Sequence, residues 1–159
     1  MQFTIVAVGS LREKYWRQAA LEYERRLSPY AKVRVHEIAP ERVQNESSPA
    51  QIQQALAKEA EKIRRVLPAN HTLVALDIAG RTFSSEQLAA YLDKEATYGR
   101  ANFIWLIGGS YGLDPSLLAE ADLRLSFSAF TFPHQLMRII LLEQLYRAMK
   151  IRRGEAYHK

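Results

Sequence analysis

Short apolar runs alternate with longer amphipathic stretches along all 159 residues, and this alternation limits the fold more than any other feature of the sequence. Residues 3–8, 72–78 and 103–107 are almost entirely apolar, which is typical of strands buried on both faces. Two further strand patterns occupy residues 32–38 and 123–126. Because helical patterns separate these strands, we expect an α/β fold: one domain, residues 1–159, with a mostly parallel sheet flanked by helices.

Local signals mark where the helices begin and end. Ser84 and Gln87 form a capping-box pattern, and Gly99 is a residue type that commonly follows the end of a helix. Serine or aspartate followed by proline marks two other helix starts. The expected helices therefore cover residues 12–27, 49–67, 84–99, a short stretch from 115, and 133–152.

The last expected helix is apolar on almost every side over residues 136–142. A helix of this kind is buried all round. In so small a domain we expect it to pack on the sheet with one side and on a second copy of the chain with the other, giving a homodimer; a deeply buried central helix is the alternative. Arg138 and Glu143 interrupt the apolar run, and we expect satisfied structural charges there unless a strand-end pocket lies beside them.

Composition excludes several classes of protein. The chain has no cysteine, which removes disulfide frameworks, thiolate catalysis and cysteine-ligated zinc. Its four histidines lack the spacing of a helical metal site, so we expect no metal. The first apolar run has no basic segment ahead of it, and no apolar stretch approaches the roughly 20 residues of a membrane span. We therefore expect a cytoplasmic protein with no membrane partner.

The net charge of +5 is concentrated near the end of the chain. Residues 147–159 contain five basic side chains against the single acidic Glu155. A basic cluster of this kind indicates a polyanionic partner such as RNA. The alternative is a solvated helix end whose cations complement the helix dipole.

Three segments follow expected strands and are candidates for a binding site, because ligands of parallel sheets bind outside the carboxyl ends of the strands. They are LDIAG at 76–80, where we expect the strand to end, IGGSYG at 107–112, and residues 126–134. The chain has neither a P-loop nor a G-x-G-x-x-G pattern after its first strand, which argues against P-loop hydrolases and Rossmann-type enzymes. No G-x-S-x-G elbow surrounds a serine, so acyl transfer is also disfavoured.

These motifs, with LSFSAFTFPHQLMRIILLEQLYRAMKI and the terminal RRGEAYHK, resemble those of the SPOUT, or α/β-knot, methyltransferases. Within that class the whole chain is similar to the RlmH type, which methylates N3 of a pseudouridine in helix 69 of bacterial 23S rRNA. The resemblance implies a C-terminal trefoil knot over about residues 72–155, which no sequence periodicity would indicate. It also implies that the substrate is the assembled ribosome.

The resemblance further implies that S-adenosylmethionine is the cofactor and binds between the three strand-end segments. The implied binding residues are Leu76, Gly108, Phe127, Ser128, Ala129, Phe130, Thr131 and Phe132. The physical chemistry agrees, because adenine favours an apolar slot with backbone hydrogen bonds and Gly108 permits a close approach.

Methyl transfer to N3 requires in-line geometry and removal of a weakly acidic proton. We expect His158 and Tyr157 to supply the base or to stabilise the developing anion, with Arg153 as a cation near the acceptor; His134 is the competing candidate. The target base is expected to leave its stack. A second set of residues, Arg152, Arg153 and Lys159, is expected to hold RNA phosphates.

Two alternatives to this function remain open on the sequence. One is a SPOUT methyltransferase for transfer RNA, although such enzymes often carry an additional RNA-binding domain that we do not see here. The other is a non-catalytic ribosome-binding protein that uses the same basic residues. Binding of S-adenosylmethionine would argue against the second.

Overall fold

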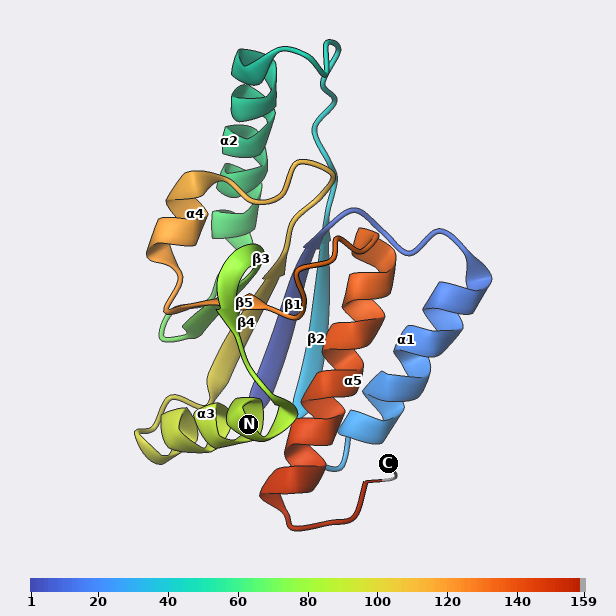
Figure 1. The fold of residues 1–159 in the computed structure, drawn as a ribbon, viewed down its shortest axis with the longest axis vertical. Helices are drawn as coiled ribbons and strands as arrows, with labels where there is room; N and C mark the ends of the chain where they lie inside the picture. Colours follow the sequence, from blue (N-terminus) through green and yellow to red (C-terminus); the bar gives the residue numbers. More distant parts are fainter. Residues whose placement is uncertain (158–159) are drawn as a thin grey trace.

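The central sheet is parallel throughout the part of the chain that this computed structural model describes, residues 1–157 (Figure 1). Its strands lie in the order β2-β1-β4-β3-β5. They are β1 (Gln2–Val8), β2 (Lys32–Ile38), β3 (Thr72–Thr82), β4 (Asn102–Ile107) and β5 (Leu123–Ser126). The prediction of a largely parallel sheet flanked by helices is confirmed, whereas the trefoil knot stays a prediction.

Helices cover both faces of the sheet. On one face lie α1 (Lys14–Leu27), α3 (Ser85–Thr97) and α5 (His134–Arg152); on the other lie α2 (Pro49–Val66) and α4 (Pro115–Glu120). The connections through α1 and α3 run along the sheet in one direction and those through α2 and α4 in the other. Right-handed crossovers that run in opposite directions place their helices on opposite faces, so the strand order itself dictates this arrangement.

Alternate side chains along the strands lie in two separate cores, one on each face of the sheet. Phe3 and Ile5 face α1, α3 and α5, whereas Val6 and Val8 face α2 and α4. Phe3 also packs against Phe103, with ring centroids 6.0 Å apart. Each fully buried side chain of this size contributes about 1.5–3 kcal/mol through removal of apolar surface from water. The double burial explains why the central strands are continuous apolar runs in the sequence.

The structure confirms most of the predicted element boundaries. Ser84 Oγ accepts a hydrogen bond from the backbone N–H of Gln87 at 3.1 Å, and the Ser84 N–H donates to Gln87 Oε1 at 2.8 Å, which completes the capping box. The predicted end of the third strand at Ile78 is wrong, because β3 continues to Thr82. Arg81 and Thr82 pair with β5 after a register shift, and an added Cβ at Gly80 would lie 2.7 Å from the carbonyl of Arg124.

Helix α5 packs between α1 and α3 (Figure 1). Its buried side chains are Arg138, Leu141, Leu142, Leu145, Ala148 and Met149. Other apolar side chains of the same helix, among them Leu136 and Ile140, stay partly exposed. The predicted burial on all sides is therefore not reached within the described part of one chain. Within residues 1–157, no helix is both long enough and apolar enough to cross a membrane.

Candidate functional site

The three strand-end segments meet around one cavity at the carboxyl edge of the sheet. Its volume is about 820 Å³, within the range of cavities that hold small molecules and cofactors. Residues 76–78, which lie within β3 beside its register shift, form one wall, the glycine-rich loop after β4 a second, and the loop between β5 and α5 a third. The lining includes Leu76, Asp77, Gly108, Tyr111, Phe130 and His134.

The second wall is closed by a tight turn that only glycine permits. An added Cβ at Gly108 would lie 2.5 Å from the carbonyl carbon and oxygen of Gly112, which is too close for any side chain. Gly112 itself has a positive φ of 81°, and its N–H donates to the Gly109 carbonyl at 3.1 Å. The loop therefore folds back on itself and exposes backbone toward the cavity.

The third wall is held in shape by two serines. Ser126 Oγ donates to the Ser128 carbonyl at 3.0 Å, and Ser128 Oγ accepts from the Phe130 N–H at 3.0 Å. Phe130 is 77% exposed at the rim of the cavity. Of the eight predicted cofactor-binding residues, all except Ala129 line the cavity. Their convergence is a structural finding, and their role in binding stays a prediction.

His134, at the first turn of α5, lies where the cavity meets the end of β1. An added Cβ on Gly9 would be 2.9 Å from its Nε2, so the imidazole lies directly over that glycine. Burial lowers the pKa of His134 below the ordinary value of 6.5, and the nearby Arg138 and Arg12 lower it further. The ring is therefore uncharged at neutral pH.

Arg138 explains part of this electrostatic environment. Its side chain is 4% exposed and donates to Glu37 Oε1 at 2.6 Å and to the Gly9 carbonyl at 3.1 Å. These contacts satisfy the two terminal nitrogens, but Arg138 Nε is buried without a hydrogen-bond partner, so the prediction of a satisfied structural charge is met only in part. Arg138 fixes the end of β1 against α5 and adds positive charge near His134.

Asp77 and Tyr111 line the cavity although the sequence analysis did not single them out. Asp77 follows Leu76 within the same motif, where the sequence analysis expected the strand to end, so this expectation could have indicated it. Arg124 Nε donates to Asp77 Oδ2 at 2.9 Å. Burial raises the pKa of Tyr111, as does the neighbouring Glu46, so its phenol stays protonated. No cluster of metal-ligating side chains occurs within residues 1–157.

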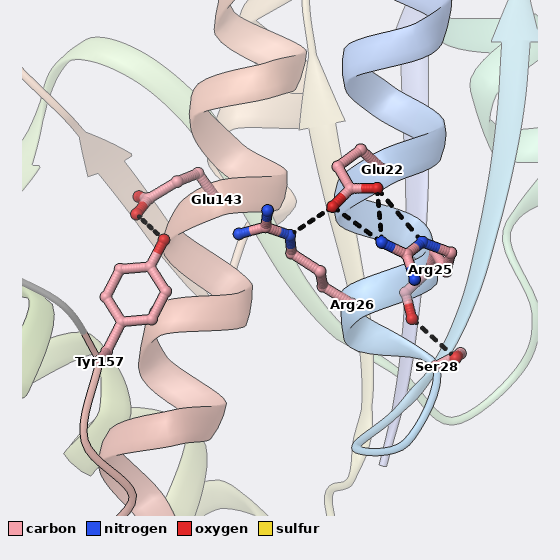
Figure 2. Close-up of polar contacts among 6 residues, drawn as sticks. All are labelled: Glu22, Arg25, Arg26, Ser28, Glu143 and Tyr157. Atoms are coloured by element: carbon pink, nitrogen blue, oxygen red, sulfur yellow. Dashed lines mark hydrogen bonds and ion pairs between the residues drawn. The ribbon is translucent and has the colours of Figure 1, made fainter.

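Tyr157 and Arg153, two of the predicted catalytic residues, lie far from the cavity of their own chain. Helix α5 runs antiparallel to the strands over 19 residues, about 28 Å at 1.5 Å per residue. Tyr157 Oη donates to Glu143 Oε1 at 3.0 Å (Figure 2). Burial raises the pKa of Tyr157 to about 12, and the hydrogen bond to Glu143 adds to the rise. These residues therefore do not line the cavity of their own chain, and their catalytic role stays a prediction.

The predicted RNA-binding arginines also lie at the amino edge of the sheet. Arg152 Nη2 donates to Asp93 Oδ1 at 2.8 Å. Arg153 donates to the Pro29 carbonyl at 3.3 Å and its guanidinium lies 4.6 Å from the centre of the Tyr30 ring. His158 and Lys159, the remaining predicted residues, lie outside the described part of the chain.

Comparison with known proteins gives the family. The sequence model of the family described as "Predicted SPOUT methyltransferase" matches residues 1–158. Among solved structures, the chain is similar to Lpg2936 from Legionella pneumophila, which is described as a methyltransferase and was solved with bound SAM. The TM-score is 0.51 and the identity 12%; the match covers 93% of this chain but only 66% of that chain, so this likeness establishes the fold alone. Because the family match spans nearly the whole sequence, this chain belongs to the SPOUT methyltransferase family.

Proposed function

We propose that this protein transfers a methyl group from S-adenosylmethionine to N3 of a pseudouridine in helix 69 of 23S rRNA, on the assembled ribosome and hence in the cytoplasm. Membership of the SPOUT methyltransferase family supports methyl transfer, and Lpg2936 with its bound SAM supports the identity of the donor. The rRNA target rests on the resemblance of the motifs to the RlmH type and on the basic residues near the end of the chain.

The observation that carries the proposal is the convergence of three strand-end loops on one cavity of about 820 Å³. The cavity combines apolar side chains with the backbone of a glycine-rich loop, in which Gly108 packs so closely against Gly112 that no larger residue fits. These features fit a nucleoside-containing cofactor. S-adenosylmethionine, when bound, supplies an electrophilic methyl group, so the protein has mainly to orient the donor and to accept a proton.

His134 is the candidate base that the structure favours. N3 of the acceptor loses its proton during methyl transfer, and a neutral imidazole can take it. Burial and the neighbouring cations lower the pKa of His134, which keeps the ring uncharged at neutral pH. Among the candidates within residues 1–157, His134 alone lines the cavity. Arg138 holds the backbone of Gly9 beneath it.

In a homodimer, the C-terminal residues of one chain would lie within reach of the cavity of the other chain. We propose that two copies pair through the outer side of α5, where Leu136 and Ile140 stay partly exposed in one chain. If the two α5 helices pack antiparallel about a twofold axis, the end of one lies beside the start of the other. Tyr157 and Arg153 then approach the partner's cavity rather than their own. This arrangement reconciles their predicted roles with their place at the amino edge.

The proposed knot concerns the same region of the chain. We propose that the chain following β5 is threaded through a loop over about residues 72–155. The resemblance of the motifs to those of the α/β-knot methyltransferases supports this threading. Its consequence for function is a rigid frame around the cavity.

The test is methyl transfer from radiolabelled S-adenosylmethionine to ribosomes that lack the modification. Naked 23S rRNA and transfer RNA are assayed in parallel. We expect label on ribosomes alone, mapped to a pseudouridine in helix 69. Label on transfer RNA would instead support the first alternative function, and the rRNA proposal would be wrong.

Equilibrium binding separates the enzyme from a non-catalytic ribosome-binding protein. Isothermal titration of the protein with S-adenosylmethionine is expected to show one site per chain. A protein that binds ribosomes but not S-adenosylmethionine would contradict the proposed activity. Sedimentation of the same sample gives the oligomeric state.

A further inference from the structure

Asp77 is the one charged residue among those that line the cavity in the described part of the chain. The other lining side chains are apolar or neutral, and His134 is kept uncharged by its surroundings. We propose that Asp77 makes the cavity prefer the positively charged methyl donor over the demethylated product. This inference rests on the proposed function and names a specificity-determining residue for it.

Positive charge surrounds the part of the cavity next to α5. Arg12 and Arg138 lie close enough to lower the pKa of His134. The N-terminus of the 19-residue α5 adds the positive end of a helix dipole. A cationic ligand is therefore disfavoured on this side, and a carboxylate elsewhere in the cavity offsets the repulsion.

Asp77 is placed to provide that negative charge. Its side chain is 16% exposed, so water screens it only in part. Arg124 pairs with its Oδ2, whereas Oδ1 has only a long contact of 3.4 Å from the Ala79 N–H. Arg124 is 45% exposed and is not part of the cavity lining. The arginine therefore weakens the field of Asp77 without blocking its access to a ligand.

The donor and the product differ by one positive charge. During methyl transfer the S–CH₃ bond breaks, the methyl group goes to the acceptor nitrogen, and the sulfur keeps the electron pair. The sulfonium becomes a neutral thioether, and all other charged groups of the ligand stay the same. A carboxylate in the cavity therefore attracts S-adenosylmethionine more than S-adenosylhomocysteine, and its attraction falls when the product forms.

The test is the ratio of the two affinities, measured by isothermal titration of the full-length protein with S-adenosylmethionine and S-adenosylhomocysteine. For Asp77→Asn we expect the preference for the donor to fall by about threefold to tenfold. For Arg124→Gln we expect the preference to rise, because the carboxylate loses its screening partner. The opposite sign of the two effects keeps the inference testable even if one variant folds poorly.

Asp93→Asn is the matched control. Asp93 also pairs with an arginine, Arg152, but at the opposite edge of the sheet. The same loss of charge there is expected to leave the affinity ratio unchanged. Circular dichroism of each variant checks that the fold is retained.

The outcomes separate this inference from the proposed function. If the wild-type protein binds neither ligand, the proposed function fails. If it binds both and Asp77→Asn weakens them equally, Asp77 contacts a part that the two ligands share, and the inference is wrong. If neither variant changes the ratio, the inference is also wrong.

Discussion

Replacing Gly108 by alanine tests whether the glycine-rich loop holds the cofactor. The added Cβ would lie 2.5 Å from the carbonyl of Gly112, about 1 Å inside the separation of roughly 3.5 Å at which carbon atoms pack. Gly112 is backbone and cannot rotate away, so the loop has to move by about that distance. Overpacking of this kind costs about 1–3 kcal/mol of unfolding free energy.

The same displacement is expected to weaken binding of S-adenosylmethionine. A shift of about 1 Å breaks backbone hydrogen bonds to a ligand, and the loss of one or two bonds at about 1 kcal/mol each lowers affinity about fivefold to thirtyfold. Isothermal titration measures the affinity. Thermal unfolding measures the stability loss, which we expect to lower Tm by about 2–12 °C in a chain of this size.

Gly99→Ala is the control for this experiment. Gly99 has a φ of +79° and an added Cβ there meets no neighbouring atom, so its replacement costs about 1–2 kcal/mol through backbone strain alone. It lies after α3, away from the cavity lining, and we expect unchanged cofactor affinity. If Gly108→Ala binds S-adenosylmethionine as tightly as Gly99→Ala does, the loop does not approach the ligand and the assignment of the cavity is refuted.

Two further substitutions test the groups at either end of α5. Because burial lowers the pKa of His134 below 6.5, the unfolded chain binds more protons than the folded one in mildly acidic solution, and stability is lost as the pH falls through about 6.5. As the pH is lowered from about 7.5 to about 5, we expect Tm to fall more steeply in the wild type than in His134→Gln. Equal slopes would show that folding does not lower the pKa of His134. Replacing both Arg152 and Arg153 by alanine is expected to weaken ribosome binding and to reduce its salt dependence while cofactor affinity is retained. Equal loss of cofactor affinity would mean that the two arginines are structural.

Local sequence signals predict the elements of this fold well. The central strands are apolar on both faces, so their pattern identifies them without knowledge of their neighbours. The capping box at Ser84 and the glycine at position 99 act within a few residues of the helix ends that they fix. The extension of β3 to Thr82 depends instead on pairing with β5, whose paired residues lie more than 40 positions later in the sequence. No local sequence pattern indicates it.

The cavity could be anticipated because it obeys a general rule of parallel sheets. Two of the lining segments directly follow β4 and β5, the third lies within the carboxyl-terminal half of β3, and strands that run in parallel end at the same edge. Asp77 lies in one of these segments. The sequence does not indicate that the other residues lining the cavity in the described part of the chain are uncharged, and this is what singles out Asp77. The place of Tyr157 could not be anticipated in this way, since it depends on the direction of α5 and on the turn after Arg153.

The apolar outer side of α5 and the distance of the C-terminal residues from their own cavity lead to one joint prediction. If Tyr157 and Arg153 act on substrate, they do so only when a second copy brings a cavity to them. Ile140→Glu, which places a charge among partly exposed apolar side chains of α5, is therefore expected to yield a monomer that binds S-adenosylmethionine but transfers no methyl group to ribosomes. Tyr98→Glu is the control, because Tyr98 is 69% exposed beyond the end of α3 and is not part of the proposed interface. Sedimentation and the methylation assay are measured on both variants. A monomeric Ile140→Glu protein with full activity would show that each chain is catalytically complete, and the C-terminal residues would then have no part in the reaction.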